Sequence, residues 1–191
     1  MKVVLFNGSE RKEGNTYHSL NIVMEELKKE GIECELIWVG GQNLQGCTAC
    51  GACGENKDAK CVLEGDKMNE YIEKMLEADG IILGSPTYFA DVSANMKALM
   101  ERAGYVCRGS GDLLKRKVGA AVVAVRRGGG AHVFSSLNYF FLIAQMIVVG
   151  SSYWNLGYGK DPGDVLDDEE GVQTFKTLGK NVVYTLKKLN D

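Results

Sequence analysis

Four of the six cysteines in this sequence of 191 residues lie within one short stretch, residues 40–65. Their spacing is Cys47-x2-Cys50-x2-Cys53-x7-Cys61, and small residues fill both short gaps, so the chain can curl tightly around one point. Compact runs of four cysteine thiolates hold [4Fe–4S] clusters in proteins. The spacing therefore predicts an iron–sulfur cluster bound by these four side chains.

Other fates of the same cysteines remain open on the sequence alone. A zinc site with four cysteines more often consists of two separated C-x2-C pairs. A redox-active or vestigial thiol cluster without metal is a further alternative, whereas disulfides are disfavoured in a reducing compartment. The usual ferredoxin run has a shorter last gap and a following proline, but here Val62 follows Cys61. Cys34 and Cys107 lie apart from the run, and we expect them to be packing residues.

A polar loop near the N-terminus has the residue types that an anion site needs. It is Asn7-Gly-Ser-Glu-Arg-Lys-Glu-Gly-Asn-Thr16, between an apolar run and a helical pattern. Its two glycines allow sharp turns, its hydroxyl and amide side chains are donors, and its arginine has a forked cation suited to phosphate. The free N–H groups of a helix start point into such a loop. The alternative is a capped helix after a surface loop.

Two later loops have complementary chemistry. Ser85–Phe89 joins aromatic residues to a turn stiffened by Pro86, which suits contact with a ribityl chain and a flat ring, although the aromatic residues could instead belong to the core. Arg126–Gly130 contains three consecutive glycines, which let backbone N–H groups approach a planar ligand edge. Its arginine pair suits an anionic ring or a second nucleotide, or else forms a solvated edge.

The elements that must position these loops alternate between apolar strands and amphipathic helices, which predicts a doubly wound α/β fold with a parallel sheet and helices on both faces. The predicted strands are Lys2–Phe6, Cys34–Val39, Gly80–Gly84, Lys117–Val125 and Met146–Gly150. The predicted helices are Tyr17–Lys29, Asp66–Glu77, Ser93–Ala103, Phe134–Gln145 and Glu169–Leu189. We expect no helix or strand in residues 40–65, a length that usually indicates function, and an irregular stretch over residues 151–168.

In such a sheet, ligands bind beyond the carboxyl ends of the strands, where all three polar loops are expected. A flat, phosphate-bearing ligand fits this arrangement, and FMN is the natural candidate for five strands in the order 2-1-3-4-5. We find no domain boundary or repeat, so residues 1–191 are predicted to form one domain with the cysteine-rich stretch as an insertion.

Composition excludes several classes of protein. The net charge of −3 gives no basic field for nucleic acid or an anionic membrane. The longest apolar stretch, Tyr139–Val149, is interrupted by Gln145 and is too short to span a bilayer. No basic start is joined to an apolar segment as in a secretory signal. We therefore expect a cytoplasmic protein.

The phosphate-loop pattern Gly8-Ser9-x-Arg11-x-x-x-Asn15-Thr16 resembles that of flavodoxin-like NAD(P)H-dependent FMN reductases. The segment Ser85–Phe89, followed by Lys97 and Arg102, resembles their second signature. The resemblance implies phosphate contacts from Ser9, Arg11, Asn15 and Thr16, and ribityl and ring contacts from Pro86, Thr87, Tyr88 and Phe89. We expect Arg126, Gly128 and Gly129 of the third loop to complete the cofactor site. Two residues depart from the pattern: Glu10 stands where relatives often have proline, and Ala90 where glycine is common.

The cysteine run, placed between the second strand and the next helix, is similar to that of the iron–sulfur flavoproteins of archaea and bacteria. This resemblance implies a homodimer or homotetramer that binds FMN and a [4Fe–4S] cluster, with the cluster near FMN across a subunit interface. The expected activity is electron transfer between cluster and FMN, with ferredoxin or NAD(P)H as redox partner and no catalytic proton-transferring side chain. The alternatives are a cluster-free NAD(P)H-dependent flavin, quinone or nitroaromatic reductase, and a flavin-free zinc- or thiol-based redox-responsive binding protein.

Overall fold

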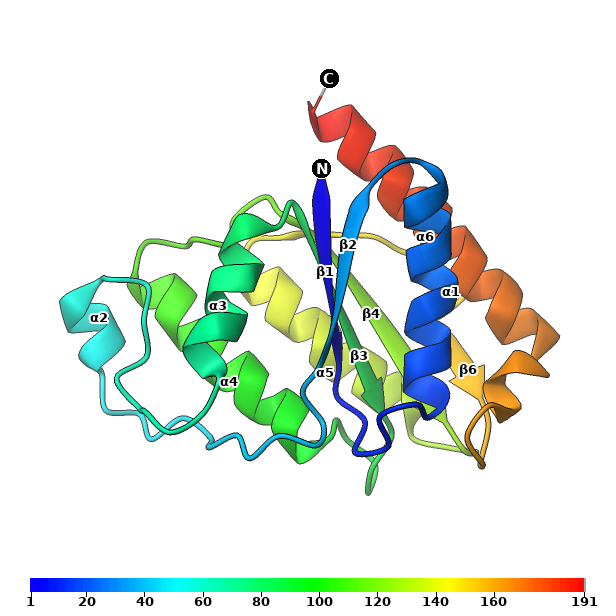
Figure 1. The fold of residues 1–191 in the computed structure, drawn as a ribbon, viewed down its shortest axis with the longest axis horizontal. Coiled ribbons are helices and arrows are strands. Elements are labelled where there is room, and N and C mark those ends of the chain that lie inside the picture. The colour runs from blue at the N-terminus through cyan, green and yellow to red at the C-terminus, as the bar shows by residue number, and fades with distance from the viewer. Residues whose placement is uncertain (191) are drawn as a thin grey trace.

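The computed structural model describes residues 1–190 and shows a parallel sheet with helices packed on both faces (Figure 1). The strands are β1 (Lys2–Asn7), β2 (Glu33–Trp38), β3 (Gly80–Pro86), β4 (Val118–Val125), β5 (Ile147–Val148) and β6 (Leu156–Tyr158). The helices are α1 (Asn15–Lys29), α2 (Ala52–Asn56), α3 (Met68–Glu77), α4 (Ala94–Gly109), α5 (Gly130–Ile143) and α6 (Glu169–Asn190), with a 3-10 turn η1 (Asp164–Leu166).

The strand order is β2-β1-β3-β4-β5, as predicted. The sequence analysis predicted an irregular stretch over residues 151–168, which was wrong in part. This stretch contains β6, which pairs with β4 beyond an interruption that follows β5. β5 pairs with the first two residues of β4, and β6 pairs with the last three. Between them the side-chain amide of buried Asn155 donates to the backbone carbonyl of Ala121 at 2.9 Å, and the backbone carbonyl of Asn155 accepts from Val123 N–H at 3.0 Å. One asparagine thus bridges the gap in the ladder.

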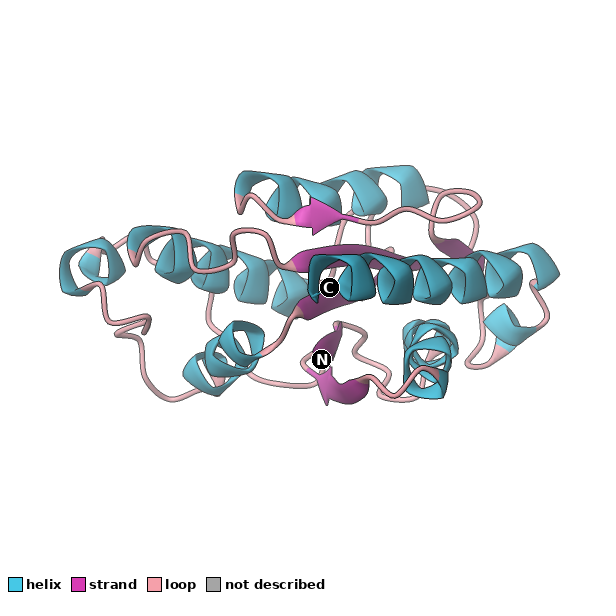
Figure 2. Ribbon diagram, turned by 90° about the horizontal axis from the view of Figure 1, so that it is seen from above, coloured by secondary structure: helices cyan, strands magenta, loops and turns pink. Residues whose placement is uncertain are grey.

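The core consists of two layers, one on each face of the sheet, as expected where parallel strands are buried on both sides. Alternate residues of β1, such as Val3 and Leu5, pack against α1 and α6. Their neighbours Val4 and Phe6 pack against α3, α4 and α5. Figure 2 shows the helices flanking the strands, with α2 standing out at one end of the molecule. No helix in residues 1–190 combines the length and apolar character needed to cross a bilayer.

Two helices differ from the prediction in ways that affect the cysteine-rich stretch. Residues 40–65 contain the short helix α2, where none was predicted, and α4 continues to Gly109 rather than ending at Ala103. The two meet closely, because a Cβ atom on Gly109 would lie 3.1 Å from the Cα atom of Gly54. The pairing of two glycines brings α2, and with it Cys53, onto the last turn of α4. A sequence pattern cannot reveal such a contact between distant segments.

Candidate functional site

The phosphate loop is organised by its first residue, to which the sequence analysis gave no role of its own. Asn7, at the end of β1, is buried. Its side-chain NH₂ group donates to the backbone carbonyl of Lys12 at 2.9 Å, and its side-chain oxygen accepts from Ser9 N–H at 3.0 Å. The hydroxyl oxygen of Ser9 in turn accepts from Arg11 N–H at 3.2 Å. These bonds fix the loop as a turn between β1 and α1. Its signal in the sequence is a polar residue at the end of an otherwise apolar strand.

The start of α1 is open to an anion. Its N-cap residue, Gly14, makes no side-chain cap, and the first turn contains no acidic residue. Thr16 is 1% exposed, and its hydroxyl has no hydrogen-bond partner in the described part of the chain. A buried, unpartnered donor beside free helix N–H groups matches what a phosphate group requires. The FMN phosphate therefore fits this loop.

Two of the predicted phosphate contacts already have partners in the protein. The side-chain carbonyl of Asn15 accepts from Gly163 N–H at 2.9 Å and from Val165 N–H at 3.3 Å. The guanidinium of Arg11 donates to the carbonyl of Lys160 at 3.2 Å. The segment after β6, predicted only as irregular, is thus tied to the phosphate loop, which is its unforeseen contribution to the site.

The chain after β2 supports the other side of the loop. A Cβ atom on Gly40 would lie 1.9 Å from the carbonyl oxygen of Ser9, so only glycine fits there without displacing the loop. The indole N–H of Trp38 donates to the same carbonyl at 2.7 Å. The carboxylate of Glu10 accepts from the side-chain amide of Asn95, at the start of α4, at 3.4 Å. The departure at Glu10 therefore directs its negative charge toward α4.

The two ring-side loops meet at the carboxyl ends of β3 and β4. The N–H of Thr87 donates to the carbonyl of Ala124 at 2.9 Å, and the Thr87 hydroxyl is buried without a partner in residues 1–190. A Cβ atom on Gly129, whose φ is +86°, would lie 3.0 Å from the Thr87 methyl group. Tyr88 and Phe89 are exposed, so the alternative that they belong to the core is wrong. Arg126 and Gly128, also predicted for the cofactor site, lie exposed after β4.

The four cysteines of the run share one cavity of about 110 Å³, which Arg102 and Tyr105 also line. All six cysteines of the chain are free thiols, and among the four in the run only Cys50 is exposed. No three His, Cys, Asp or Glu side chains in residues 1–190 are grouped as ligands of a single metal ion. A [4Fe–4S] cluster differs from a single ion, because each of its irons takes its own thiolate and the sulfurs stand further apart. The donor set and its shared cavity fit such a cluster.

Helix α3 and helix α4 hold the run in place. The side chain of Asn69 makes two hydrogen bonds to the backbone of Cys61, accepting from its N–H at 2.8 Å and donating to its carbonyl at 2.9 Å. The hydroxyl of Ser110, just after α4, accepts from Ala59 N–H at 3.2 Å. The fourth cysteine is therefore placed by contacts from α3, outside the run itself.

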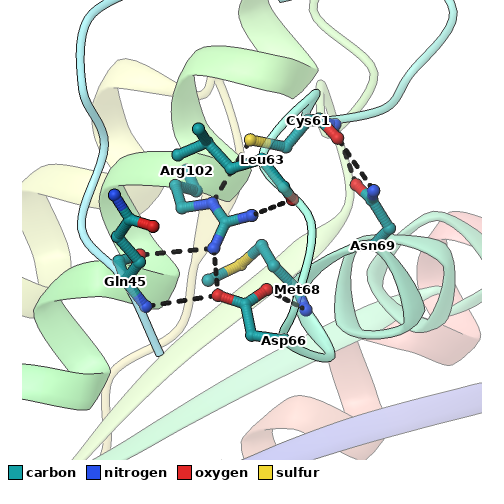
Figure 3. A network of polar contacts seen from close by, with 7 residues as sticks. All are labelled: Gln45, Cys61, Leu63, Asp66, Met68, Asn69 and Arg102. Atoms are coloured by element: carbon teal, nitrogen blue, oxygen red, sulfur yellow. Dashed lines mark hydrogen bonds and ion pairs between the residues drawn. The ribbon is translucent and has the colours of Figure 1, made fainter. Parts of the chain in front are cut away.

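Arg102 of α4 lies at the centre of a buried polar network around the fourth cysteine (Figure 3). Its Nε–H donates to Cys61 Sγ at 3.2 Å, and one terminal nitrogen donates to the carbonyl of Leu63 at 2.9 Å. The other terminal nitrogen pairs with the Asp66 carboxylate and donates to the carbonyl of Gln45 at 3.3 Å. Burial opposes ionisation of Asp66, but the hydrogen bonds from Arg102 and from backbone N–H groups lower its pKa below the ordinary value. The pair is therefore ionic at neutral pH.

A larger open cavity, about 600 Å³, connects the cysteines to the loop after β3. Asp91 and Ser136 lie at its lining, and Cys47, Ala49 and Tyr105 line both this cavity and the cysteine cavity. The cavity thus extends from Cys47 to Asp91 in the turn after β3, and its lining within residues 1–190 contains none of the predicted FMN contacts.

Comparison with known proteins decides the family. Residues 1–161 match the family of NADPH-dependent FMN reductases. The chain belongs to this family. It is 42% identical to an iron–sulfur flavoprotein of Methanocaldococcus jannaschii, over 98% of each chain. It is 34% identical to an iron–sulfur flavoprotein of Methanosarcina thermophila, over 98% of this chain and 96% of that protein.

Solved structures support the same fold. A flavodoxin-like WrbA-like protein of Agrobacterium tumefaciens has a TM-score of 0.65 at 15% identity, covering 98% of this chain and 97% of that one. An archaeal flavodoxin has a TM-score of 0.64 at 17% identity, covering 98% and 99%. The predicted family and flavodoxin-like fold class are confirmed, and this FMN reductase family member is a flavin-dependent oxidoreductase.

The loop after β3 in this FMN reductase family member contains two non-glycine residues in the left-handed region. Phe89 has a φ of +48° and Ala90 a φ of +72°, within a tight turn closed by two backbone hydrogen bonds between Tyr88 and Asp91. The Asp91 carboxylate is also held by the hydroxyl of Ser136 at 2.9 Å. The alanine at position 90, where relatives often have glycine, is therefore strained.

Replacing Ala90 by glycine is expected to stabilise the protein by about 0.5–1 kcal/mol. The left-handed conformation costs an L-residue roughly 1–2 kcal/mol, and part of the relief is offset by the greater freedom of glycine in the unfolded chain. Urea unfolding at equilibrium measures the difference. The matched control is Ala131→Gly in the first turn of α5, which should destabilise by up to about 1 kcal/mol. Equal destabilisation of both variants would show that the turn is not strained.

Proposed function

We propose that this chain is an FMN-dependent electron-transfer oxidoreductase that passes electrons between a [4Fe–4S] cluster and FMN. The observation that carries the proposal is the shared cavity of Cys47, Cys50, Cys53 and Cys61 in a chain of the FMN reductase family. Relatives named iron–sulfur flavoproteins match nearly the whole chain, which supports the same reading.

The proposed FMN site uses the open start of α1 for the phosphate. The Thr16 hydroxyl and the free N–H groups of α1 donate to it, together with Ser9, while Arg11 supplies positive charge and Asn15 holds the neighbouring segment. Pro86 and Thr87 face the ribityl chain in this proposal. The ring contacts come from Tyr88, Phe89, Arg126, Gly128 and Gly129.

The four cysteines, which share one cavity, are the proposed cluster ligands. When bound, FMN supplies one- and two-electron chemistry and the cluster one-electron chemistry. The chain's own residues position the two groups and limit access of water. None is assigned as a proton-transferring group; Nε2 of His132, the histidine nearest the glycine-rich loop, lies 3.4 Å from a carboxylate oxygen of Asp91.

The proposed partners are redox proteins or small donors, namely ferredoxin or NAD(P)H, and a second or further copies of this chain in a homodimer or homotetramer. The net charge of −3 argues against nucleic acid and anionic membranes as partners. The description of the family as NADPH-dependent supports NADPH as a donor. The similarity to iron–sulfur flavoproteins supports a redox protein as a partner.

Protein purified without oxygen should contain FMN together with about four irons and matching acid-labile sulfide per chain. Flavin absorbance with neither iron nor sulfide would overturn the cluster part of the proposal. Stoichiometric zinc without flavin would instead support the flavin-free binding protein.

A second candidate function is a cluster-free NAD(P)H-dependent reductase of flavin, quinone or nitroaromatic acceptors. The family description favours it, as does a match of 34% identity over 84 residues to an NAD(P)H dehydrogenase (quinone) of Trichlorobacter lovleyi. Steady oxidation of NAD(P)H by metal-free protein would support it. Absence of turnover with either nicotinamide would reject it.

A further inference from the structure

We propose that Arg102 is a positioning residue that raises the reduction potential of the cluster through its hydrogen bond to Cys61. This inference rests on the proposed function, because it requires the cluster. It assigns a role in electron transfer to a side chain of α4 that lies outside the cysteine run and bonds to Gln45, Cys61, Leu63 and Asp66.

The contact geometry is specific to arginine. The Nε–H group lies 3.2 Å from Cys61 Sγ, while the two terminal nitrogens are held by the Asp66 carboxylate and by backbone carbonyls. All three nitrogens therefore have partners, and the fork cannot turn away from the sulfur. A lysine at this position could not serve the sulfur and the carboxylate at once.

Burial makes the contact effective. The Arg102 side chain is 0% exposed and that of Asp66 6%, so water and salt screen them little. Reduction adds one negative charge to a cluster and its thiolates, and a donor aimed at a ligand sulfur stabilises that charge. Hydrogen bonds to the sulfurs and local net charge are known determinants of cluster potential.

The pairing with Asp66 defines what Arg102 contributes. Together the two side chains are neutral, so their summed charge has little effect on the cluster at a distance. The influence of Arg102 on the cluster is therefore its hydrogen bond to Cys61. Asp66 does not interrupt this bond, because it contacts Arg102 from the side away from the sulfur (Figure 3). Removing the arginine and the carboxylate together therefore isolates the hydrogen bond, and removing the carboxylate alone leaves an uncompensated positive charge.

The test is a reductive titration of anaerobic holoprotein, with the cluster followed by electron paramagnetic resonance. In each step the oxidised cluster takes one electron from dithionite, whose S–S bond breaks and which ends as sulfite with oxygen from water; no bond or proton is exchanged at the cluster. The double variant Arg102→Met with Asp66→Asn should make reduction at least tenfold less favourable, a shift of about 59 mV to lower potential for one electron. Asp66→Asn alone should shift the potential in the opposite direction.

The control is Arg116→Met, which removes an exposed arginine before β4 and should leave the potential unchanged. Opposite shifts in the two test variants support the inference, since mere loosening of the fold would not change sign between them. If the double variant fails to take up iron, Arg102→Lys decides, because lysine keeps the positive charge but cannot serve the sulfur and the carboxylate at once, so the potential should fall. If the wild type holds the cluster and the double variant, or Arg102→Lys in its place, has the wild-type potential, the role of Arg102 is overturned and the proposed function stands. A wild type that takes up no iron overturns both.

Discussion

Cys50→Ala is expected to lower the iron content below that of a complete [4Fe–4S] cluster while leaving the fold and FMN binding in place. Cys50 is the exposed thiol of the run, so its removal creates no buried cavity and should change stability by less than about 0.5 kcal/mol. Four thiolates give each iron one protein ligand, so without Cys50 one iron has no thiolate and is expected to be lost. Iron and sulfide per chain, measured with the flavin spectrum on one sample, report the loss.

The matched control removes a thiol that the cavity does not include. Cys34 lies half-buried in β2, and burial raises its pKa to about 11, so it remains a protonated packing residue at neutral pH. Cys34→Ala should keep the full iron and sulfide content. Full iron and sulfide in Cys50→Ala as well would contradict the assignment of Cys50 as a ligand and would favour a site that uses fewer cysteines.

The architecture of this protein was readable from the sequence because its signals are local. Apolar runs such as that of β4 are buried along their whole length, and their alternation with amphipathic helices defines a parallel sheet. The continuation of the last strand as β6 was not readable in this way. It depends on Asn155, which is 1% exposed and reaches across to Ala121, and a lone polar residue in a polar stretch gives no such indication.

In the candidate site, too, the local features were predictable from the sequence and the contacts between distant segments were not. The spacing of the cysteines and the composition of the phosphate loop are local, and both led to the proposed ligands. The supporting contacts are distant in sequence: Asn15 and Val165 are 150 positions apart, and Arg102 and Cys61 are 41 apart. Gly40 is required only because the carbonyl of Ser9 lies where its side chain would be. Such requirements arise from packing, which a single sequence does not display.

Thr16→Val is expected to weaken FMN binding about ten- to a hundredfold and to stabilise the cofactor-free protein. Valine has the shape of threonine but cannot donate, so the variant removes the buried hydroxyl that lacks a partner in residues 1–190. A hydrogen bond to a charged group contributes about 1.5–3 kcal/mol, which corresponds to this loss of affinity. Without phosphate the same hydroxyl is desolvated and unpaired, so its removal should raise the free energy of unfolding by about 1 kcal/mol.

The two expected changes have opposite signs, which separates ligand binding from packing. General damage to the loop would weaken FMN binding and lower stability together, whereas loss of a phosphate donor weakens only the binding. Titration of the cofactor-free protein with FMN gives the dissociation constant, and urea unfolding without FMN gives the stability. Thr177→Val is the control for binding: the half-buried Thr177 lies on α6, its hydroxyl donates to the carbonyl of Gln173 at 2.9 Å, and its loss should leave the FMN affinity unchanged. Unchanged FMN affinity in Thr16→Val would mean that the phosphate lies elsewhere, and the open start of α1 would then need another ligand.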